Sequence, residues 1–327
     1  MKIILAGVFN VPWSTNHFMK KHLERLGHQV LPFELDWSHP RPLALNERLW
    51  FKLSSSIKAQ TLGKKLLGLA RSQEPDAVVV VKGKRLNPGI TEQLARQTLV
   101  AYRYMDAPLH RYVADHSKAS NLIFVTGKHL VEPLSLITGR NNVHHLLEGC
   151  DSEVHKSAGY DGNYACDVAF AGAPAPDRIN LLRACRRAGY KVKIWGPPGW
   201  PRDLDYTRKF AYGEGLAKIC ASAKIVLGVN SRNDHPGYFS DRALLVLACR
   251  GFHLTRYVPG LEDYFDNLKH LAWFKDQTEM LKIIKDYIGN DSARAGIAAA
   301  GQALVYQKYT WERSLKSMME IIEQKKR

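Results

Sequence analysis

Residues 237–255, "GYFSDRALLVLACRGFHLT", hold a loop, a charged helix start, an apolar helix body and a short strand in one run. Ser240 is a favoured residue for the start of a helix, because its hydroxyl can accept from a backbone N–H of the first turn. The apolar run "GFHLT" that follows is typical of a buried strand. A helix that leads directly into a buried strand is the repeating unit of α/β proteins.

The same alternation extends over the whole chain and predicts parallel sheets built from βαβ units. The expected strands are nearly continuous in apolar residues, as in strands that are buried on both faces. In the first half they are "KIILAGVF", "HQVLPFEL", "DAVVVVK", "TLVAYRYM", "NLIFVTG" and "NVHHLLEG". In the second half they are "CDVAFAG", "KVKIWG", "AKIVLGV", "GFHLT" and "HLAWF", and about fifty residues of helical pattern follow.

A polar, glycine-containing stretch, "SEVHKSAGYDGNYA" (152–165), separates the two series and is expected to be a hinge. A chain of 327 residues exceeds the usual size of a single core, so two doubly wound domains are predicted. Ligands of open parallel sheets bind outside the carboxyl ends of the strands. We therefore expect a site in a cleft between the two halves.

The net charge of +16 is the unusual feature of the composition. Lys and Arg outnumber Asp and Glu by 20 to 11 up to Cys150 and by 27 to 20 after it, so no basic tail explains the excess. Such a field favours anionic partners, namely nucleic acid, an acidic lipid surface or phosphorylated small molecules. The alternative is charge that serves solubility only.

Several classes of protein are disfavoured by the sequence. The N-terminus "MKIILAGVFNVPW" is predicted to be a first strand rather than a signal peptide, and no apolar run approaches the length of a transmembrane segment. The five cysteines are odd in number and widely spaced, which indicates reduced, structural thiols and a cytoplasmic protein. The turn after the first strand lacks G-x-G-x-x-G, so a dinucleotide cofactor is not expected.

The helix start at Ser240, Asp241 and Arg242 is the strongest candidate site. First-turn N–H groups and the helix dipole favour an anion, and Arg242 could hold a second phosphate oxygen. Asp241 fits this hypothesis if it points to solvent or accepts from a sugar hydroxyl. Capping alone explains Ser240 and Asp241 but not Arg242, so a phosphate site is favoured.

Two further loops of the second half carry candidate residues. Gly172 lets a ligand approach the backbone, and Arg178 stands in a first helical turn, where the dipole disfavours a cation and an anion would offset it. In "IWGPPGWPRDLD", Trp200 could bracket a flat base. Asp203 and Asp205 form a D-x-D pattern, but in a Pro-rich loop with no strand directly ahead, so we interpret it as chance and expect no metal site.

In the first half, candidates follow three strands. Trp13 and His17 could line an acceptor pocket, or be part of a helix cap with an aromatic staple. Lys82, Lys84 and Arg85 stand at one strand end, as an anion contact or a solvated loop. Asp106 leaves the next strand and could be a general base with a raised pKa, or cap a helix that begins near Pro108.

Two segments of the second half, "AKIVLGVNSRNDHPGYFSDRALLVLACRGFHLTRYVPGLEDYF" and "IAAAGQALVYQKYTWERSLKSMM", carry a family resemblance. They are similar to the C-terminal half of the glycosyltransferases grouped with the spore-maturation protein CgeB, with a Ser-x-Arg helix start, a small-residue turn, a Gly-Leu-Glu segment and a final Thr-x-x-x-Arg helix. The first half resembles them more loosely, through "ERLGHQVLPFELD", "PDAVVVVKG", "YMDAP" and "LLEGCDSEVHK".

The resemblance implies a GT-B fold: two Rossmann-like domains that face a central cleft, with C-terminal helices that cross back. The expected parts are an acceptor domain (1–155), a nucleotide-sugar domain (165–305) and a final helix on the first domain (306–327). Such enzymes usually need no metal and no cofactor. Three departures stand out: Leu245 replaces the common Glu for the donor ribose, Arg250 replaces the first glycine of the turn, and Tyr309 replaces a His.

We therefore predict a metal-independent glycosyltransferase. Arg242, the Ser240 backbone and Arg178 would hold the diphosphate, Asn230 and Tyr238 would line the cleft, and Asp106 or His17 would be the base. The acceptor would be anionic, either DNA with a modified base or a glycolipid or polysaccharide. A non-catalytic nucleotide-sugar-binding or assembly protein of the same fold is the alternative, supported by Leu245. A pure nucleic-acid-binding module has no recognisable motif here.

Overall fold

The computed structural model describes residues 1–36, 45–230 and 232–326, except for the side chains of 45–56. The chain divides into two compact units. Unit 1 comprises Met1–Leu147 and Ser314–Arg327, and unit 2 comprises Glu148–Arg313. The chain thus leaves unit 1 after Leu147 and returns to it at Ser314.

Unit 1 is built on a six-stranded parallel sheet with the strand order β2-β1-β3-β4-β5-β6. Its strands are β1 (Lys2–Gly7), β2 (Gln29–Glu34), β3 (Ala77–Val81), β4 (Leu99–Tyr104), β5 (Leu122–Val125) and β6 (Val143–His145). The chain adds β2 on one side of β1 and then β3 on the other side, so the switch point of the sheet lies between β1 and β3. Ligands of open parallel sheets bind at the carboxyl ends of the strands at such a point.

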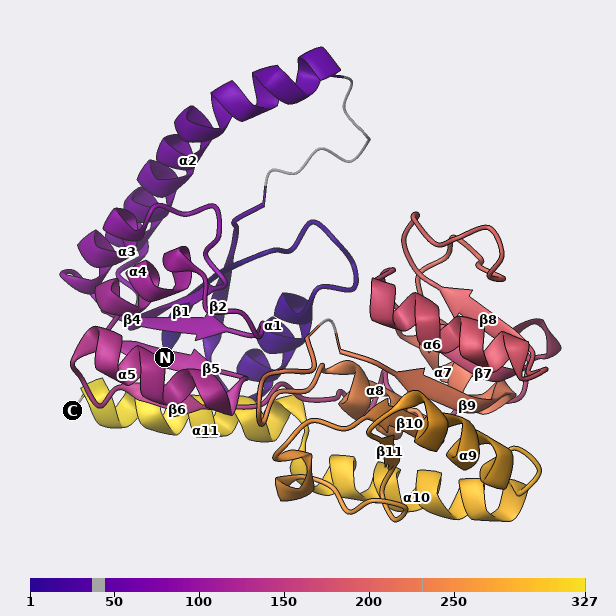
Figure 1. Cartoon of the computed structure of the whole chain (residues 1–327). Coiled ribbons are helices and arrows are strands. Elements are labelled where there is room, and N and C mark those ends of the chain that lie inside the picture. The colour runs from indigo at the N-terminus through magenta and orange to yellow at the C-terminus, as the bar shows by residue number, and fades with distance from the viewer. Residues whose placement is uncertain (37–44, 231, 327) are drawn as a thin grey trace. The chain divides into compact units, whose positions relative to one another are not determined.

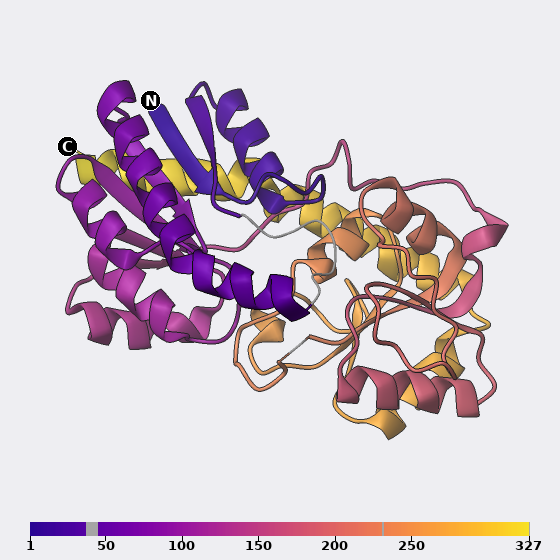
Figure 2. The ribbon, with the colours of Figure 1, turned by 90° about the horizontal axis from the view of Figure 1, so that it is seen from above.

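The helices of unit 1 are α1 (Thr15–Arg25), α2 (Leu45–Gln73), α3 (Pro88–Ala95), α4 (Arg111–Ala119), α5 (Val131–Thr138) and most of α11 (Trp311–Lys326). Figure 1 shows α11 on the opposite side of the sheet from α2 and α3, and Figure 2 again shows it alongside the elements of unit 1. Leu315, Met318 and Ile322 of α11 are fully buried, because they repeat at helical spacing on one face.

Unit 2 is built on a five-stranded parallel sheet with the strand order β11-β10-β9-β7-β8. Its strands are β7 (Cys166–Ala171), β8 (Val192–Trp195), β9 (Ala223–Gly228), β10 (His253–Arg256) and β11 (Ala272–Phe274). The chain moves from β7 to β8 on one side and then to β9 on the other, so the switch point lies at β7.

The helices of unit 2 are α6 (Pro176–Arg187), α7 (Glu214–Ser222), α8 (Arg242–Ala248), α9 (Gln277–Tyr287) and α10 (Asp291–Lys308). Its core packs β7, β8, β9 and β10 against α6 and α9, with Phe170, Leu182, Leu227 and Ile284 fully buried.

All eleven expected strands are confirmed, and the chain after β11 is helical. None of the described helices is both long enough and apolar enough to cross a membrane.

Candidate functional site

A pocket of about 270 Å³ lies at the carboxyl ends of β7 and β8 in unit 2. We call it the carboxyl-end pocket. It occupies the edge where open parallel sheets bind ligands, next to the switch point at β7. It is lined by Ala171, Gly172, Ala173, Trp195, Gly196, Pro197, Phe210, Ala211, Tyr212, Leu216, Asp241, Arg242 and Leu245.

Two glycines let the loops after β7 and β8 meet in this pocket. Gly172 N donates to Trp195 O at 2.8 Å. A β-carbon on Gly196 would lie 2.1 Å from Gly172 O, and one on Gly172 would lie 3.4 Å from Arg242 Nη2. A larger residue at position 172 would therefore enter the space beside the Arg242 guanidinium, and one at position 196 would collide with the backbone of Gly172.

Arg242 is the first residue of α8, and its side chain lines the carboxyl-end pocket. Its guanidinium makes no hydrogen bond or ion pair with any described residue. A guanidinium that lines a pocket in this way can still give all of its N–H groups to an anion, in the two-bond geometry that carboxylates and phosphates accept.

Arg178 lies in the first turn of α6 and is buried. Its Nε donates to Val229 O at 3.1 Å and its Nη1 to Ala173 O at 2.8 Å. Burial, followed by the nearby charge of Arg242, lowers the pKa of Arg178 to about 10. The charges of Arg178 and Arg242 repel each other, and Arg178 is bonded to two carbonyl groups rather than to a carboxylate. An anion beside them would therefore stabilise both charged side chains.

The helix start differs in detail from the expectation. Ser240 was expected as the N-cap of α8, but Asp241 occupies that position and makes no side-chain capping bond. The Ser240 hydroxyl donates to Asp241 Oδ1 at 2.9 Å, and Arg242 N reaches Ser240 Oγ at 3.4 Å. Because α8 has only seven residues, the case for an anion here depends on the guanidinium groups rather than on the helix start.

Asn230 and Tyr238 are buried beside this segment. Asn230 Oδ1 accepts from Ser240 N at 3.0 Å, whereas Asn230 Nδ2 has no hydrogen-bond partner in the described part of the chain. Neither residue lines the carboxyl-end pocket. Asn230 instead fixes the backbone that leads into Arg242.

The walls of the carboxyl-end pocket are aromatic and apolar. The rings of Phe210 and Tyr212 stack at a centroid distance of 5.8 Å and are 48% and 44% exposed, and Trp195 lies on the same pocket. Leu245, one turn after Arg242, also lines it. Such faces suit a flat heterocycle, because aromatic rings prefer to stack in an offset manner.

Trp200 does not take the role expected of it. It is buried in the core of unit 2, and its indole N–H donates to Gly172 O at 3.3 Å. Trp195, Phe210 and Tyr212 are the aromatic residues that line the carboxyl-end pocket. The signal that could have located two of them is the spacing of aromatic residues in the basic loop "TRKFAYGEG".

The D-x-D pattern is partly engaged in an ion pair. Asp203 accepts from Arg183 Nε and Nη2, both at 2.8 Å, so its carboxylate is held in a bidentate pair. Neither Asp203 nor Asp205 lines the carboxyl-end pocket. Among the described residues, no three His, Cys, Asp or Glu side chains gather as metal ligands would.

In unit 1, Asp106 follows β4, and its carboxylate accepts from Lys82 Nζ at 2.9 Å. Both side chains are nearly half exposed, at 45% and 43%. The helix that follows begins at Arg111 with His110 as its N-cap, so the alternative that Asp106 caps this helix is wrong.

The other candidates of unit 1 surround the loops after β1 and β3. His17 Nε2 lies 3.0 Å from Phe9 O, and its ring packs edge-on against Phe9. Trp13 is 42% exposed. Arg85 pairs with Asp36 at 3.1 Å, whereas Lys84 is exposed. Of the three expected cations, Lys82 and Arg85 are thus engaged with carboxylates.

Comparisons with known proteins agree with this architecture. Residues 178–320 match a family model described as "Glycosyl transferase-like". Sucrose-phosphate synthase from Thermosynechococcus elongatus has a TM-score of 0.73 at 12% identity, over 99% of this chain and 98% of that chain. HepE of Anabaena, solved with UDP and glucose, has a TM-score of 0.70 at 13% identity, over 99% and 100%.

A third similar structure is an alpha-glucosyltransferase in complex with UDP and a 13-mer DNA, with a TM-score of 0.66 at 10% identity over 99% of both chains. The fold is GT-B. The expected fold class is thereby confirmed, with a Rossmann-like parallel sheet in each unit of this GT-B chain. No curated protein matches the sequence.

Proposed function

We propose that this protein is a glycosyltransferase that takes its sugar from a nucleotide-sugar donor, with a UDP-sugar as the first candidate. The observation that carries the proposal is the Arg242 guanidinium, which lines the carboxyl-end pocket and is bonded to none of the described residues. The family match over residues 178–320 and the UDP complexes of two similar structures support it.

In this proposal the carboxyl-end pocket holds the nucleoside diphosphate. The base would lie against Trp195, Phe210 and Tyr212, and the diphosphate beside Arg242. Arg178, which is buried outside the pocket lining and held by the carbonyl groups of Ala173 and Val229, would contribute its positive charge. The two guanidinium groups would stabilise the charge that develops on the departing diphosphate.

We propose that the reaction needs no metal and no cofactor. Guanidinium groups can do for the leaving diphosphate what a divalent ion does in other enzymes, since both neutralise developing negative charge. The Asp203 carboxylate is already engaged with Arg183.

The chemical step would be displacement at the anomeric carbon. The acceptor hydroxyl oxygen forms the new bond to that carbon and gives its proton to a base, and the diphosphate leaves with the electron pair of the broken bond. Asp106 and His17 of unit 1 are the proposed bases. Asp106→Asn and His17→Gln separate them, because only the substitution of the true base should abolish transfer while UDP binding persists.

A thermal-shift screen of nucleosides, nucleoside diphosphates and nucleotide sugars, each with and without EDTA, tests the proposal. A ligand present at 100 times its Kd should stabilise the folded state by about 2.7 kcal/mol. Stabilisation by a diphosphate but not by its nucleoside, unchanged by EDTA, is expected. If no nucleotide stabilises the protein, the donor assignment is wrong. If the stabilisation disappears with EDTA, the metal-independent mechanism is wrong.

A non-catalytic nucleotide-sugar-binding or assembly protein is the second candidate, and Leu245 in the carboxyl-end pocket favours it. Such a protein would bind the donor but neither transfer nor hydrolyse its sugar. Release of UDP from a bound UDP-sugar, followed over time with candidate acceptors, distinguishes the two.

For the acceptor we propose a polyanion, with DNA first and an anionic glycolipid or polysaccharide second, because of the net charge of +16. A titration of a fluorescent duplex at several salt concentrations should give an affinity that falls steeply with salt. Lys84→Ala should weaken binding more than Arg85→Ala, because Arg85 is already paired with Asp36. Sugar transfer onto the duplex is the deciding observation, and its absence at low salt would exclude DNA.

The motifs quoted above also lead us to propose membership of the group around CgeB, and the five widely spaced, free cysteines lead us to propose a cytoplasmic location.

A further inference from the structure

Unit 2 has a second pocket, of about 510 Å³, whose charged lining residues are Asp167, Lys191, Lys224, Arg250, Asp291 and Arg294. We call it the amino-end pocket. Asp167 is the second residue of β7 and Lys224 the second of β9, while Lys191 directly precedes β8. The pocket therefore lies at the amino ends of the strands, whereas the carboxyl-end pocket lies at the other ends of the strands of the same sheet.

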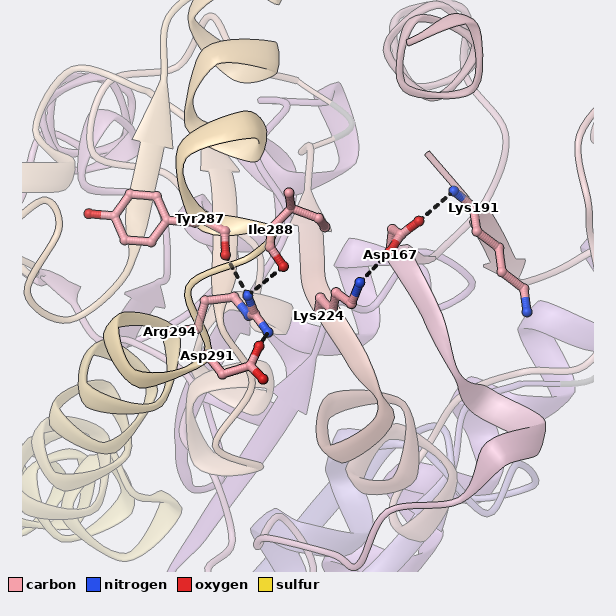
Figure 3. A network of polar contacts seen from close by, with 7 residues as sticks. All are labelled: Asp167, Lys191, Lys224, Tyr287, Ile288, Asp291 and Arg294. Atoms are coloured by element: carbon pink, nitrogen blue, oxygen red, sulfur yellow. Dashed lines mark hydrogen bonds and ion pairs between the residues drawn. The ribbon is translucent and has the colours of Figure 1, made fainter. Parts of the chain in front are cut away.

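Both carboxylates of the amino-end pocket are already engaged. Asp167 accepts from Lys224 Nζ and from Lys191 N, both at 2.9 Å. Asp291 pairs with Arg294, which also donates to the carbonyl groups of Tyr287 and Ile288. Figure 3 shows the Asp167 carboxyl group between Lys224 and Lys191, and the Arg294 guanidinium surrounded by its three partners.

Two cations remain. The side-chain ammonium of Lys191 and the guanidinium of Arg250 have no hydrogen bond or ion pair within the described ranges. Four cations against two carboxylates leave the lining with a net charge of two positive units. The Cys166 thiol of the same pocket adds no negative charge at neutral pH, since burial raises its pKa to about 12.

Arg250 stands in a strained backbone position. Its N–H donates to Leu247 O at 2.9 Å and that of Gly251 to Val246 O at 3.0 Å, which is the Schellman arrangement that ends α8. The residue at this position has φ +59°, a left-handed conformation that glycine adopts without strain. An arginine here costs folding free energy, and strain of this kind is concentrated at functional sites.

The remaining lining sets the size and character of the ligand. Phe252, Ala295 and Ala298 give the amino-end pocket apolar surface, and Tyr160, 72% exposed, stands beside it. A phosphate monoester carries a charge close to two negative units, which matches the two unengaged cations. Its ester group would lie on the apolar surface.

We infer that the amino-end pocket is a second ligand site, separate from the carboxyl-end pocket, which binds a dianionic phosphate group through Arg250 and Lys191. Arg250 holds two phosphate oxygens through its planar group, and Lys191 adds a point charge. The group arrives either as inorganic phosphate or as the phosphate of a small organic monoester.

Arg250→Gly is the sharpest variant for testing this site, because it removes the guanidinium and relieves the left-handed backbone at once. Calorimetric titration of the full chain with glucose 6-phosphate, inorganic phosphate and glucose is the measurement. We expect both phosphates to bind wild type and glucose not to bind. Arg250→Gly should lower phosphate affinity at least tenfold while its melting temperature stays equal or rises.

A control variant assigns the binding to this pocket. Arg187→Ala, which removes an exposed charge at the end of α6, should leave phosphate affinity unchanged. Lys191→Ala should weaken it. UDP binding should survive Arg250→Gly, so a failure here and a failure of the proposed donor site give different results.

Three results would overturn the inference: no phosphate binding to wild type, unchanged affinity in Arg250→Gly, or an equal loss in Arg187→Ala. Tighter binding of glucose 6-phosphate than of phosphate would identify a monoester as the ligand, and the reverse order would identify inorganic phosphate.

Discussion

Arg242 is the first residue of α8 and Arg250 the second residue after its end, and the two residues line different pockets of unit 2. This short segment thus places one cation at the carboxyl ends of the strands and one at their amino ends, and neither side chain is bonded to a described residue. The predictions below test what these and other positions do.

Arg242→Ala should weaken UDP binding by about 1.5–3 kcal/mol, because one charge-assisted contact to phosphate is lost. Binding of uridine, which has no phosphate, should stay the same. Calorimetry with both ligands measures the difference, with Arg187→Ala as the charge-matched control. Equal losses for UDP and uridine would instead indicate that Arg242 supports the fold.

Leu245→Gln should create a preference for ribose over 2′-deoxyribose of about 1 kcal/mol, as expected for one new neutral hydrogen bond. In wild type, UDP and its 2′-deoxy form should bind alike, since leucine offers no such bond. Glutamine is chosen over glutamate because a carboxylate three residues after Arg242 could pair with it. Leu245→Met, which keeps the volume, is the control, and a ribose preference already present in wild type would refute the idea.

His253 should make the protein less stable in mild acid. It is fully buried, its Nδ1 contacts Val226 O at 3.0 Å, and burial lowers its pKa to about 4. The unfolded chain takes up the proton near pH 6.5, so stability present above that pH is lost as the pH falls toward 4. The loss approaches about 3 kcal/mol.

Urea titrations between pH 7 and pH 4 on wild type and His253→Asn measure this effect. Asparagine can keep the bond to Val226 O but does not titrate. The stability of wild type relative to the variant should decline across this range, and parallel curves for the two proteins would count against the prediction.

Gly149→Ala should destabilise the protein by about 1–3 kcal/mol or more, as overpacking does. The added β-carbon would lie 2.2 Å from Trp311 N and 2.3 Å from the carbonyl carbon of Thr310, and backbone atoms cannot rotate away. Gly159→Ala, whose β-carbon would have no neighbour within 4 Å, is the matched control. Equal urea midpoints for the two variants would mean that the chain relaxes at this point.

Asp203→Ala should leave UDP binding unchanged, with or without EDTA, because Asp203 is paired with Arg183 and lies outside the lining of the carboxyl-end pocket. Thermal shifts with UDP in EDTA and in Mg²⁺ check this. A shift that needs Mg²⁺ in wild type and is lost in the variant would restore the D-x-D pattern as a metal site.

The strands could be predicted from the sequence because burial on both faces leaves an almost unbroken apolar run, and β3 with its five buried residues is the clearest case. The same reasoning pointed to Gly172 and Arg242, which directly follow strand or loop signals and both line one pocket.

Side-chain partners that come from separate elements could not be predicted. Phe210 and Tyr212 belong to the loop between β8 and α7, whose path no periodicity defines. The pairs of Arg183 with Asp203 and of Lys82 with Asp106 join residues about twenty positions apart. The left-handed backbone at Arg250 could not be predicted from the sequence either, because arginine rarely adopts this conformation.

The return of the chain to unit 1 has a practical consequence. Cys150 and Thr310 form a parallel bridge, with Cys150 N donating to Tyr309 O at 2.9 Å and Trp311 N to Cys150 O at 3.0 Å. Within unit 1, Ser314 Oγ donates to Leu147 O at 2.6 Å. Unit 2 is therefore a domain inserted into unit 1 with its two ends side by side, and its return junction lies within α11. Residues 148–313 expressed as a separate fragment, and unit 1 rejoined across a short linker, would test on different polypeptides the donor binding and the acceptor binding that we propose.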